Sequence, residues 1–176
     1  MILLGFGSNL AGPWGSPAET LERAIDEIET CGLHVVARSA WYLSAPFGRT
    51  DQPAFVNGAL AVETHISPPA VLARCHQVER NAGRLRRSRW GPRVLDIDLL
   101  AYHGRVIPDR RGRRARNQGL HTGLVLPHPG IAERPFVLEP ICEIAPAWRH
   151  PVSHLTAAQM LEKLRGQQQG VVLSKA

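Results

Sequence analysis

Two segments of the chain carry the same helix-boundary signals, and strand-forming stretches surround them. Ser16 and Ser67 are each an N-cap candidate followed by proline at the first helical position. Gly32 and Gly83 end the two segments. Around them lie four stretches rich in β-branched or other apolar residues, "ILLGFGS", "LHVVARSAWYLS", "AFVNGALAVETHI" and "VLDIDLLAY". The chain is therefore expected to alternate in the order β, α, β, β, α, β.

That order predicts an α+β fold of the ferredoxin-like βαββαβ type, an antiparallel sheet with helices on one face. The other face of the sheet would then be available for a site. After Tyr102 the chain is rich in Arg and Gly and has no apolar periodicity, so we expect a mobile loop there. The segments "HPGIAERPFVLEPICEIAP" and "SHLTAAQMLEKLRG" predict extra C-terminal helices. With 176 residues, the chain is expected to form one domain, residues 1–176.

Positive charge is concentrated in one part of the chain. The formal net charge is +6, and positions 84–116 hold eleven of the 21 basic residues beside only three acidic ones. A basic patch of this kind indicates a phosphate-bearing partner, which is either a nucleic acid or a nucleotide. Nearly all the basic residues are arginines, whose forked guanidinium group suits phosphate oxygens. Charge therefore indicates the chemistry of the partner and leaves its identity open.

Two aspartates follow the arginines at alternate positions of a predicted strand. Asp96 and Asp98 should point to the same face, because successive side chains of a strand alternate between faces. Paired carboxylates repel each other unless a cation lies between them, and Mg²⁺ that also binds substrate phosphates is a suitable cation. A salt-bridged surface pair is the alternative. Trp90, within a polar loop, is expected either to be buried or to cover a ligand.

Five motifs together resemble one enzyme family. "GSNL", "YLSAPFGRTDQPAFVNGAL", "RLRRSRWGPRVLDIDLL", "LPHP" and "RPFVLEPICEIAP" occur in the order found in 6-hydroxymethyl-7,8-dihydropterin pyrophosphokinase. The resemblance runs from about Ile2 to Pro146. It implies a ferredoxin-like fold and transfer of diphosphate from ATP to the hydroxymethyl group of a reduced pterin for folate biosynthesis, leaving AMP.

The resemblance also implies a role for each matching residue. Asp96 and Asp98 match the ligands of two Mg²⁺ ions, and Arg84 and Arg93 match catalytic arginines. The implied ATP-binding residues are Glu79, Arg86, Arg89, Trp90, His128 and Arg134. The implied pterin-binding residues are Ser44, Ala45, Phe47, Phe55, Asn57 and Phe136. Among these, Phe55 and Phe136 would stack on the two faces of the pterin ring, and Asn57 would bind its amide edge.

Two departures from the family pattern leave alternatives open. Ala45 replaces a common proline, and an Arg/Gly-rich insertion occupies about residues 109–123. A divergent paralogue with an altered acceptor or reduced activity is therefore the second interpretation. The third is a basic RNA-binding ferredoxin-like module, which should interleave aromatic with basic residues on its central strands. The strand sequences "FVNGALAV" and "VLDIDLL" have almost no such residues, so this interpretation ranks last.

The expected partners are two small molecules, ATP and a reduced pterin. We expect no nucleic-acid or membrane partner and a monomeric chain. The sequence has neither a signal-peptide pattern nor an apolar run of membrane-spanning length, which predicts a cytoplasmic location.

Overall fold

The computed structural model of the chain describes residues 1–85, 91–108, 123–166 and 169–176. The predicted order of the first six elements is confirmed, apart from a break in the second strand. The elements are β1 (Ile2–Ser8), α1 (Pro17–Thr30), β2 (His34–Arg38), β3 (Tyr42–Ser44), β4 (Phe55–Glu63), α2 (Pro68–Asn81), β5 (Asp96–Tyr102), η1 (Ile131–Glu133), α4 (Pro135–Ile144), α5 (Ala157–Lys163) and β6 (Val172–Lys175). Of the loop predicted after Tyr102, residues 103–108 are described, and Ile107 forms an isolated bridge with Leu126. The insertion at about 109–123 lies outside the described residues except for Gly123.

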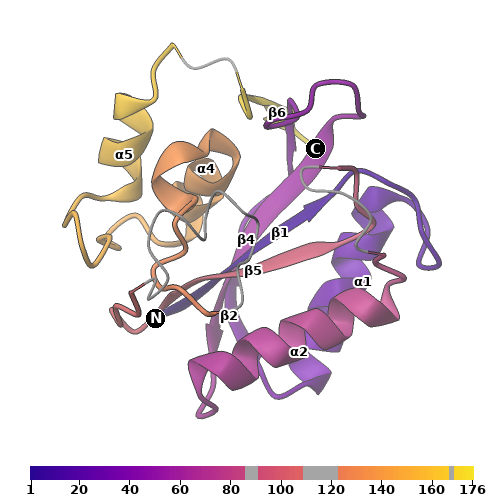
Figure 1. The fold of residues 1–176 in the computed structure, drawn as a ribbon, viewed down its shortest axis with the longest axis horizontal. Helices are drawn as coiled ribbons and strands as arrows, with labels where there is room; N and C mark the ends of the chain where they lie inside the picture. The colour runs from indigo at the N-terminus through magenta and orange to yellow at the C-terminus, as the bar shows by residue number, and fades with distance from the viewer. Residues whose placement is uncertain (86–90, 109–122, 167–168) are drawn as a thin grey trace.

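The described strands form one antiparallel sheet. Its order is β5-β1-β4-β3-β6, and β2 also pairs with β4. The first and last predicted strands are therefore neighbours, as the ferredoxin-like arrangement requires. Figure 1 shows this sheet running between two groups of helices.

The predicted second strand is broken into β2 and β3, and Trp41, which lies in the break, packs its ring over β4. Gly58 of β4 has no side chain, and a Cβ there would lie 2.5 Å from the ring of Trp41. The Ser39 side chain accepts a hydrogen bond from the backbone N–H of Ala59 at 3.0 Å, so that N–H keeps a partner at the break. Trp41 packs into the core beside Phe6, with ring centroids 6.5 Å apart.

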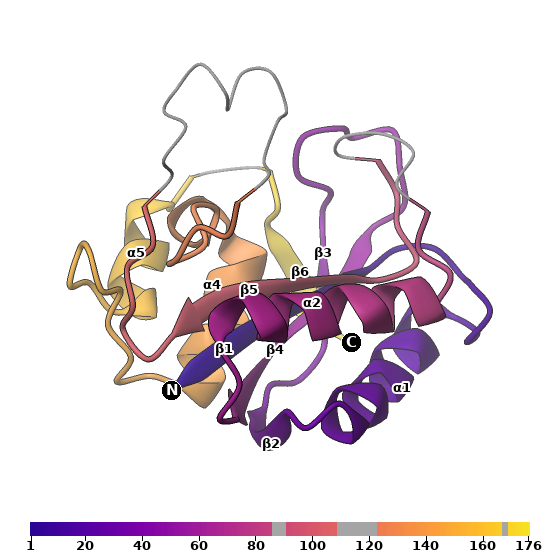
Figure 2. The same cartoon turned by 60° about the horizontal axis from the view of Figure 1, so that its bottom comes forward.

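Helices lie on both faces of the sheet. Helices α1 and α2 pack on one face, where Leu4, Leu60 and Ile97 belong to a continuous apolar core (Figure 2). Helices α4 and α5 pack on the other face, over a second core that includes Leu3 and Leu100. The prediction of a free second face therefore holds only beyond these helices, and this is where the cavity described below is found.

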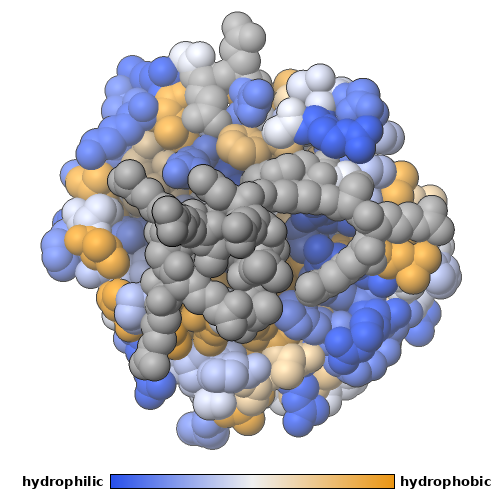
Figure 3. All heavy atoms as spheres, in the orientation of Figure 1, coloured by the Kyte–Doolittle hydropathy of each residue, from blue (hydrophilic) through white to orange (hydrophobic). Residues whose placement is uncertain are grey.

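The C-terminal region differs from its prediction. An amphipathic helix was expected over "SHLTAAQMLEKLRG", and α5 forms there after a capping box between Thr156 and Gln159. The chain then returns to the sheet as β6, a strand that the sequence did not predict. Among the described residues, no helix combines the length and apolarity needed to cross a bilayer. Figure 3 shows hydrophilic and apolar side chains interspersed over the described part of one face.

Candidate active site

A cavity of about 240 Å³ opens on the second face of the sheet, beside the first residues of β5. Its walls come from β1, β3, β4, β5, the segments that flank β5 and the first turn of α4. Twelve of the predicted site residues line it, namely Ser44, Ala45, Phe47, Phe55, Asn57, Arg84, Arg93, Asp96, Asp98, His128, Arg134 and Phe136. The fold thus brings residues that are far apart in the sequence to one place.

Glycines of β1 keep the floor of the cavity open. A Cβ on Gly7 would lie 2.9 Å from the Asn57 side-chain oxygen, and one on Gly5 would lie 3.1 Å from the Leu100 side chain. The Asn57 amide donates a hydrogen bond to the Ser44 hydroxyl at 2.7 Å, and both side chains are buried. Since a buried amide needs partners, this pair forms an ordered polar surface in an otherwise aromatic part of the cavity.

The two aspartates of β5 face the cavity together, which confirms the alternation expected from the sequence. The residues between and beside them, Leu95, Ile97 and Leu99, are buried in the core on the other face. Arg84 Nη1 lies 2.5 Å from one carboxylate oxygen of Asp96, and Arg93 binds the other. Asp98 is more open, with 37% of its side chain exposed, and lies 3.9 Å from both His128 Nε2 and Arg134 Nη1.

These neighbours and burial shift the pKa values of the two carboxyl groups in opposite directions. Burial raises the pKa of Asp96, but Arg93 and Arg84 together lower it by more, so the net shift is downward. Burial, and then repulsion from Asp96, raises the pKa of Asp98 despite the attraction of His128 and Arg134. Asp98 is therefore the carboxylate whose negative charge is less fully compensated, and an added cation would be favourable there.

Glu79 lies behind this layer and does not line the cavity. Only 3% of its side chain is exposed, and its Oε1 accepts a hydrogen bond from the backbone N–H of Ile97 at 2.8 Å. It also forms an ion pair with Arg84. Burial raises the pKa of Glu79 to about 7, even though the charge of Arg84 opposes this shift. In the structure, Glu79 therefore supports Arg84 and the start of β5.

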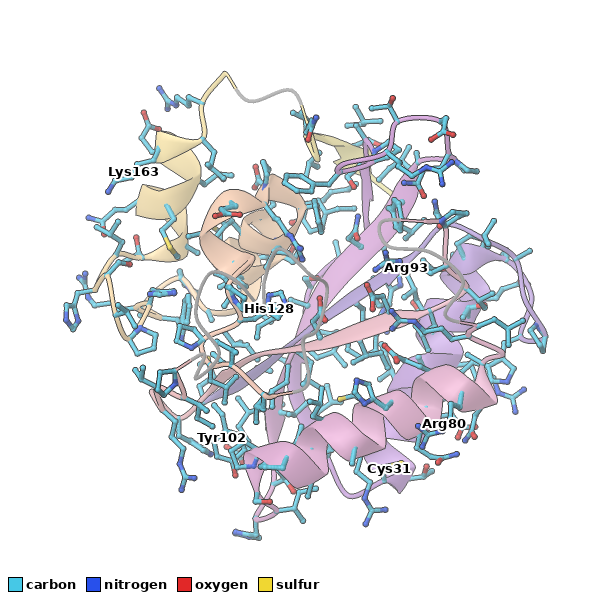
Figure 4. The ribbon with its side chains drawn as sticks, in the orientation of Figure 1. Cys31, Arg80, Arg93, Tyr102, His128 and Lys163 are labelled. Carbon is cyan, nitrogen blue, oxygen red and sulfur yellow. The ribbon has the colours of Figure 1, made fainter. Side chains whose placement is uncertain are left out.

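Arg134 connects the aromatic and acidic parts of the cavity. A Cβ on Gly130 would lie 2.6 Å from the guanidinium carbon, so the glycine allows the arginine to pack against the backbone. The same carbon lies 5.7 Å from the ring centroid of Phe47 and 6.0 Å from that of Phe136. His128 reaches the site because its backbone N–H binds the carbonyl of Leu100 at 2.8 Å. Figure 4 shows His128 and Arg93 on the same side of β5, at different positions along it.

Asn9 is a supporting residue that sequence reasoning missed. Its side-chain oxygen accepts a hydrogen bond from the backbone N–H of Arg93 at 2.8 Å. Its amide nitrogen donates to the carbonyl of Pro53 at 3.0 Å and to the Gln52 side chain at 3.2 Å. One buried amide therefore links the arginine segment to the loop before β4. The motif "GSNL" contained this residue, but its partners are distant in the sequence.

The remaining predicted residues, Arg86, Arg89 and Trp90, lie outside the described part of the chain. Their roles stay predictions, as do the individual roles of the residues that line the cavity.

The fold and the site together define a class of protein, a ferredoxin-like α+β domain with a carboxylate pair and clustered arginines beside an aromatic cavity. Residues 3–146 match the family model of 7,8-dihydro-6-hydroxymethylpterin-pyrophosphokinase (HPPK). The chain belongs to this family.

Curated relatives agree with the family match. A 2-amino-4-hydroxy-6-hydroxymethyldihydropteridine pyrophosphokinase of Methylorubrum extorquens is 45% identical over 144 residues, which is 81% of each chain. A protein of the same name from Synechocystis is 37% identical over 163 residues, 92% of this chain and 75% of its own. The family membership favours an enzyme over the RNA-binding module considered from the sequence.

Solved structures share the fold. The wild-type HPPK-DHPS of Plasmodium falciparum matches with a TM-score of 0.67 at 14% identity, over 94% of this chain. This chain spans 44% of that longer protein.

Replacing Asn9 by Ala should destabilise the fold and loosen the arginine segment. The substitution leaves the N–H of Arg93 and the carbonyl of Pro53 without their partner, and we expect a loss of about 1–3 kcal/mol. Urea unfolding measures this change. Asn81→Ala, at an exposed position on α2, is the matched control and should cost less than about 0.5 kcal/mol. Equal losses in the two variants would contradict the role given to Asn9.

Glu79 should make the stability of the fold depend on pH. Its pKa is raised from 4.5 to about 7 in the folded protein, so the folded state binds the proton more tightly than the unfolded state. The contribution of Glu79 to wild-type stability should therefore fall as the pH rises through this window. Glu79→Gln cannot lose a proton, so its stability relative to wild type should increase over the same range.

The measurement is the free energy of unfolding of both proteins below and above the window. The exposed Glu63→Gln variant is the control for loss of a charge. A difference between Glu79→Gln and wild type that does not change with pH would show that folding does not raise the pKa of Glu79.

Proposed function

We propose that the protein transfers the diphosphate group of ATP to the hydroxymethyl group of 6-hydroxymethyl-7,8-dihydropterin, giving AMP and the pterin diphosphate for folate biosynthesis. One observation carries this proposal. A single cavity places paired carboxylates and three arginines next to an aromatic surface with a buried amide. The part of the cavity with the carboxylates and arginines suits a polyphosphate, and the aromatic part with the buried amide suits a flat heterocycle. The family membership and the relatives' names agree with it.

Arg84 and Arg93 would bind the phosphates of ATP. Both now hold Asp96, and both side chains are largely withdrawn from solvent. Phosphate oxygens would compete with the carboxylate for the same guanidinium groups, which are well matched to either. Arg134 and His128, on the opposite side of Asp98, would complete the positive lining. These groups balance the charge that spreads over the phosphate oxygens during transfer.

The chain offers two carboxylates to divalent metal ions. Asp96 and Asp98 face the cavity, and the described residues include no cluster of three or more metal-ligating side chains. Two carboxylates with room for phosphate and water oxygens fit Mg²⁺, which retains several non-protein ligands. We propose two such ions held by this pair; when bound, they would neutralise phosphate charge and polarise the acceptor hydroxyl. The incomplete charge compensation at Asp98 supports this assignment.

The acceptor would bind in the aromatic part of the cavity. Phe55 and Phe136 would contact the faces of the pterin ring, and Phe47, Ser44 and Ala45 would border it. Asn57 would bind the amide edge of the pterin, because its side chain is already oriented by Ser44. A site that pairs buried polar groups with its substrate rejects rings that lack the complementary groups.

The reaction itself needs no covalent intermediate with the chain. The hydroxymethyl oxygen forms a bond to the β-phosphorus of ATP while the bond from that phosphorus to the oxygen shared with the α-phosphate breaks. AMP leaves with that oxygen, and the hydroxyl proton passes to solvent water. The chain positions the two substrates in line and excludes competing water.

We further propose that the protein works as a monomer in the cytoplasm. One copy of the chain supplies both the charged and the aromatic lining of the cavity, so a monomer has both halves of the described site.

Replacing Asp96 by Ala should abolish turnover. The purified protein is incubated with ATP, Mg²⁺ and 6-hydroxymethyl-7,8-dihydropterin, and AMP is resolved from ADP by chromatography. We expect pterin-dependent AMP from the wild type and a loss of at least about a hundredfold in the variant, because the metal and both arginines lose their shared carboxylate.

Asp26→Ala, an exposed position of α1 on the other side of the sheet, is the control for removal of an aspartate. It should keep its rate within about twofold. Thermal unfolding checks that both variants are folded. Absence of pterin-dependent AMP in the wild type would contradict the proposed function, and an active Asp96→Ala protein would contradict the metal assignment.

A further inference from the structure

The C-terminal segment 170–176 lies beyond the residues that match the family model, yet it packs against the aromatic half of the cavity. Strand β6 pairs with β3, where Ser44 is aligned with Val172. Just before β6, the carbonyl of Val171 accepts a hydrogen bond from the backbone N–H of Ala45 at 3.0 Å. The backbone of two cavity-lining residues is therefore held by the end of the chain.

Gly170 makes the closest approach to the aromatic rings. A Cβ built on this buried glycine would lie 2.8 Å from Cδ1 of Phe136 and 3.2 Å from Cδ2 of Phe47. The two rings are in edge-to-face contact, with centroids 6.2 Å apart. Gly170 does not itself line the cavity, whereas both rings do. A side chain at position 170 would have to displace at least one of them, because real Cβ atoms essentially never come this close.

The strand is anchored at its other end as well. The carboxylate of Glu143 on α4 accepts a hydrogen bond from the Tyr42 hydroxyl at 2.5 Å and lies 3.5 Å from Lys175 Nζ. The backbone N–H of Ala176 binds the carbonyl of Trp41 at 2.8 Å. Because both ends of the segment are attached to β3 and its neighbours, the position of Gly170 relative to the rings is fixed.

We propose that Gly170 is a positioning residue for the acceptor half of the site. Because Gly170 has no side chain, the rings of Phe47 and Phe136 can pack against its backbone. The pairing of β6 with β3 holds the glycine in this position. This role rests on the proposed function, since those rings are assigned to the pterin. The nucleotide half lies around Arg84, Arg93 and Asp96, none of which is among the nearest neighbours of Gly170 within 4 Å. A change at Gly170 should therefore act more on the acceptor than on ATP, which it can reach through Arg134, whose guanidinium lies over both rings.

The chain provides a matched control for this test. Gly170 has a backbone φ of +66°, a conformation that favours glycine, so any substitution there adds backbone strain as well as crowding. Gly166 has a φ of +88° in the same C-terminal region, and a Cβ there would meet nothing within 4 Å. Substitutions at Gly166 thus report the strain alone, and those at Gly170 report strain and crowding together.

The experiment compares Gly170→Ala with Gly166→Ala in the full chain. A second pair, Gly170→Asn and Gly166→Asn, reduces the strain because asparagine adopts positive φ more readily than alanine. Steady-state kinetics gives the KM for each substrate. Calorimetry measures binding of 6-hydroxymethylpterin in the presence of α,β-methylene-ATP, which cannot release AMP. Thermal unfolding identifies folded variants, and the asparagine pair decides the question if Gly170→Ala does not fold.

We expect both Gly170 variants to raise the acceptor KM and to weaken pterin binding by about tenfold. Their KM for ATP should change less than the acceptor KM, and both constants of the Gly166 variants should stay within about twofold of wild type. A folded Gly170 variant with wild-type acceptor affinity would overturn the proposal. Equal effects at Gly166, or an equal rise in the KM for ATP, would overturn it too.

Failure of the proposed function is distinguishable from failure of the positioning role. If the proposed function is wrong, the wild type forms no pterin-dependent AMP. Calorimetry would still test the positioning role if the wild type binds the pterin, and a wild type that does not bind it would overturn the positioning role as well.

Discussion

The ion pairs between buried carboxylates and arginines at the start of β5 determine how the rest of the site is built. Burying one such charge without a partner would be costly, so Glu79, Asp96, Arg84 and Arg93 have to be placed together. Asp96 forms ion pairs with both arginines, and Glu79 forms a further ion pair with Arg84. In the proposed function, phosphates would replace the carboxylates as partners of the arginines, and divalent cations would replace the arginines as partners of the carboxylates.

The fold places this charged group beside an apolar cavity by using the two faces of one sheet differently. One face packs against α1 and α2, and Ile97 and Leu99 of β5 are buried in the apolar core between them. On the other face, α4 and α5 cover only part of the sheet, and the glycines of β1 leave space for the cavity. The acidic residues of β5 and the aromatic residues near β3, β4 and α4 therefore line the same cavity.

The sequence predicted those features that depend on local chemistry. The N-cap positions Ser16 and Ser67, each followed by proline, were sufficient to place the starts of α1 and α2. The alternation of polar and apolar residues along β5 was sufficient for the shared face of Asp96 and Asp98. Ile97 lies between them and is buried in the core, so the carboxylates on either side of it turn toward the cavity.

The features that the sequence did not predict depend on contacts between distant residues. Strand β6 is short and largely exposed, and it forms because β3 offers it an edge. At the break between β2 and β3, Trp41 fits over Gly58, which no local pattern reveals. Asn9 and Gly170 are likewise recognisable only from their partners, which are the arginine segment for the first and the aromatic rings for the second.

The central claim is that this site moves an intact diphosphate group, and following the phosphorus atoms tests it most directly. The protein is supplied with 6-hydroxymethyl-7,8-dihydropterin and with ATP that carries radioactive phosphorus at either the β or the γ position. We expect the label to reach the pterin product from both positions, with unlabelled AMP released. Transfer of the γ label alone, with labelled ADP left from the β-labelled ATP, would show transfer of a single phosphate and would contradict the account.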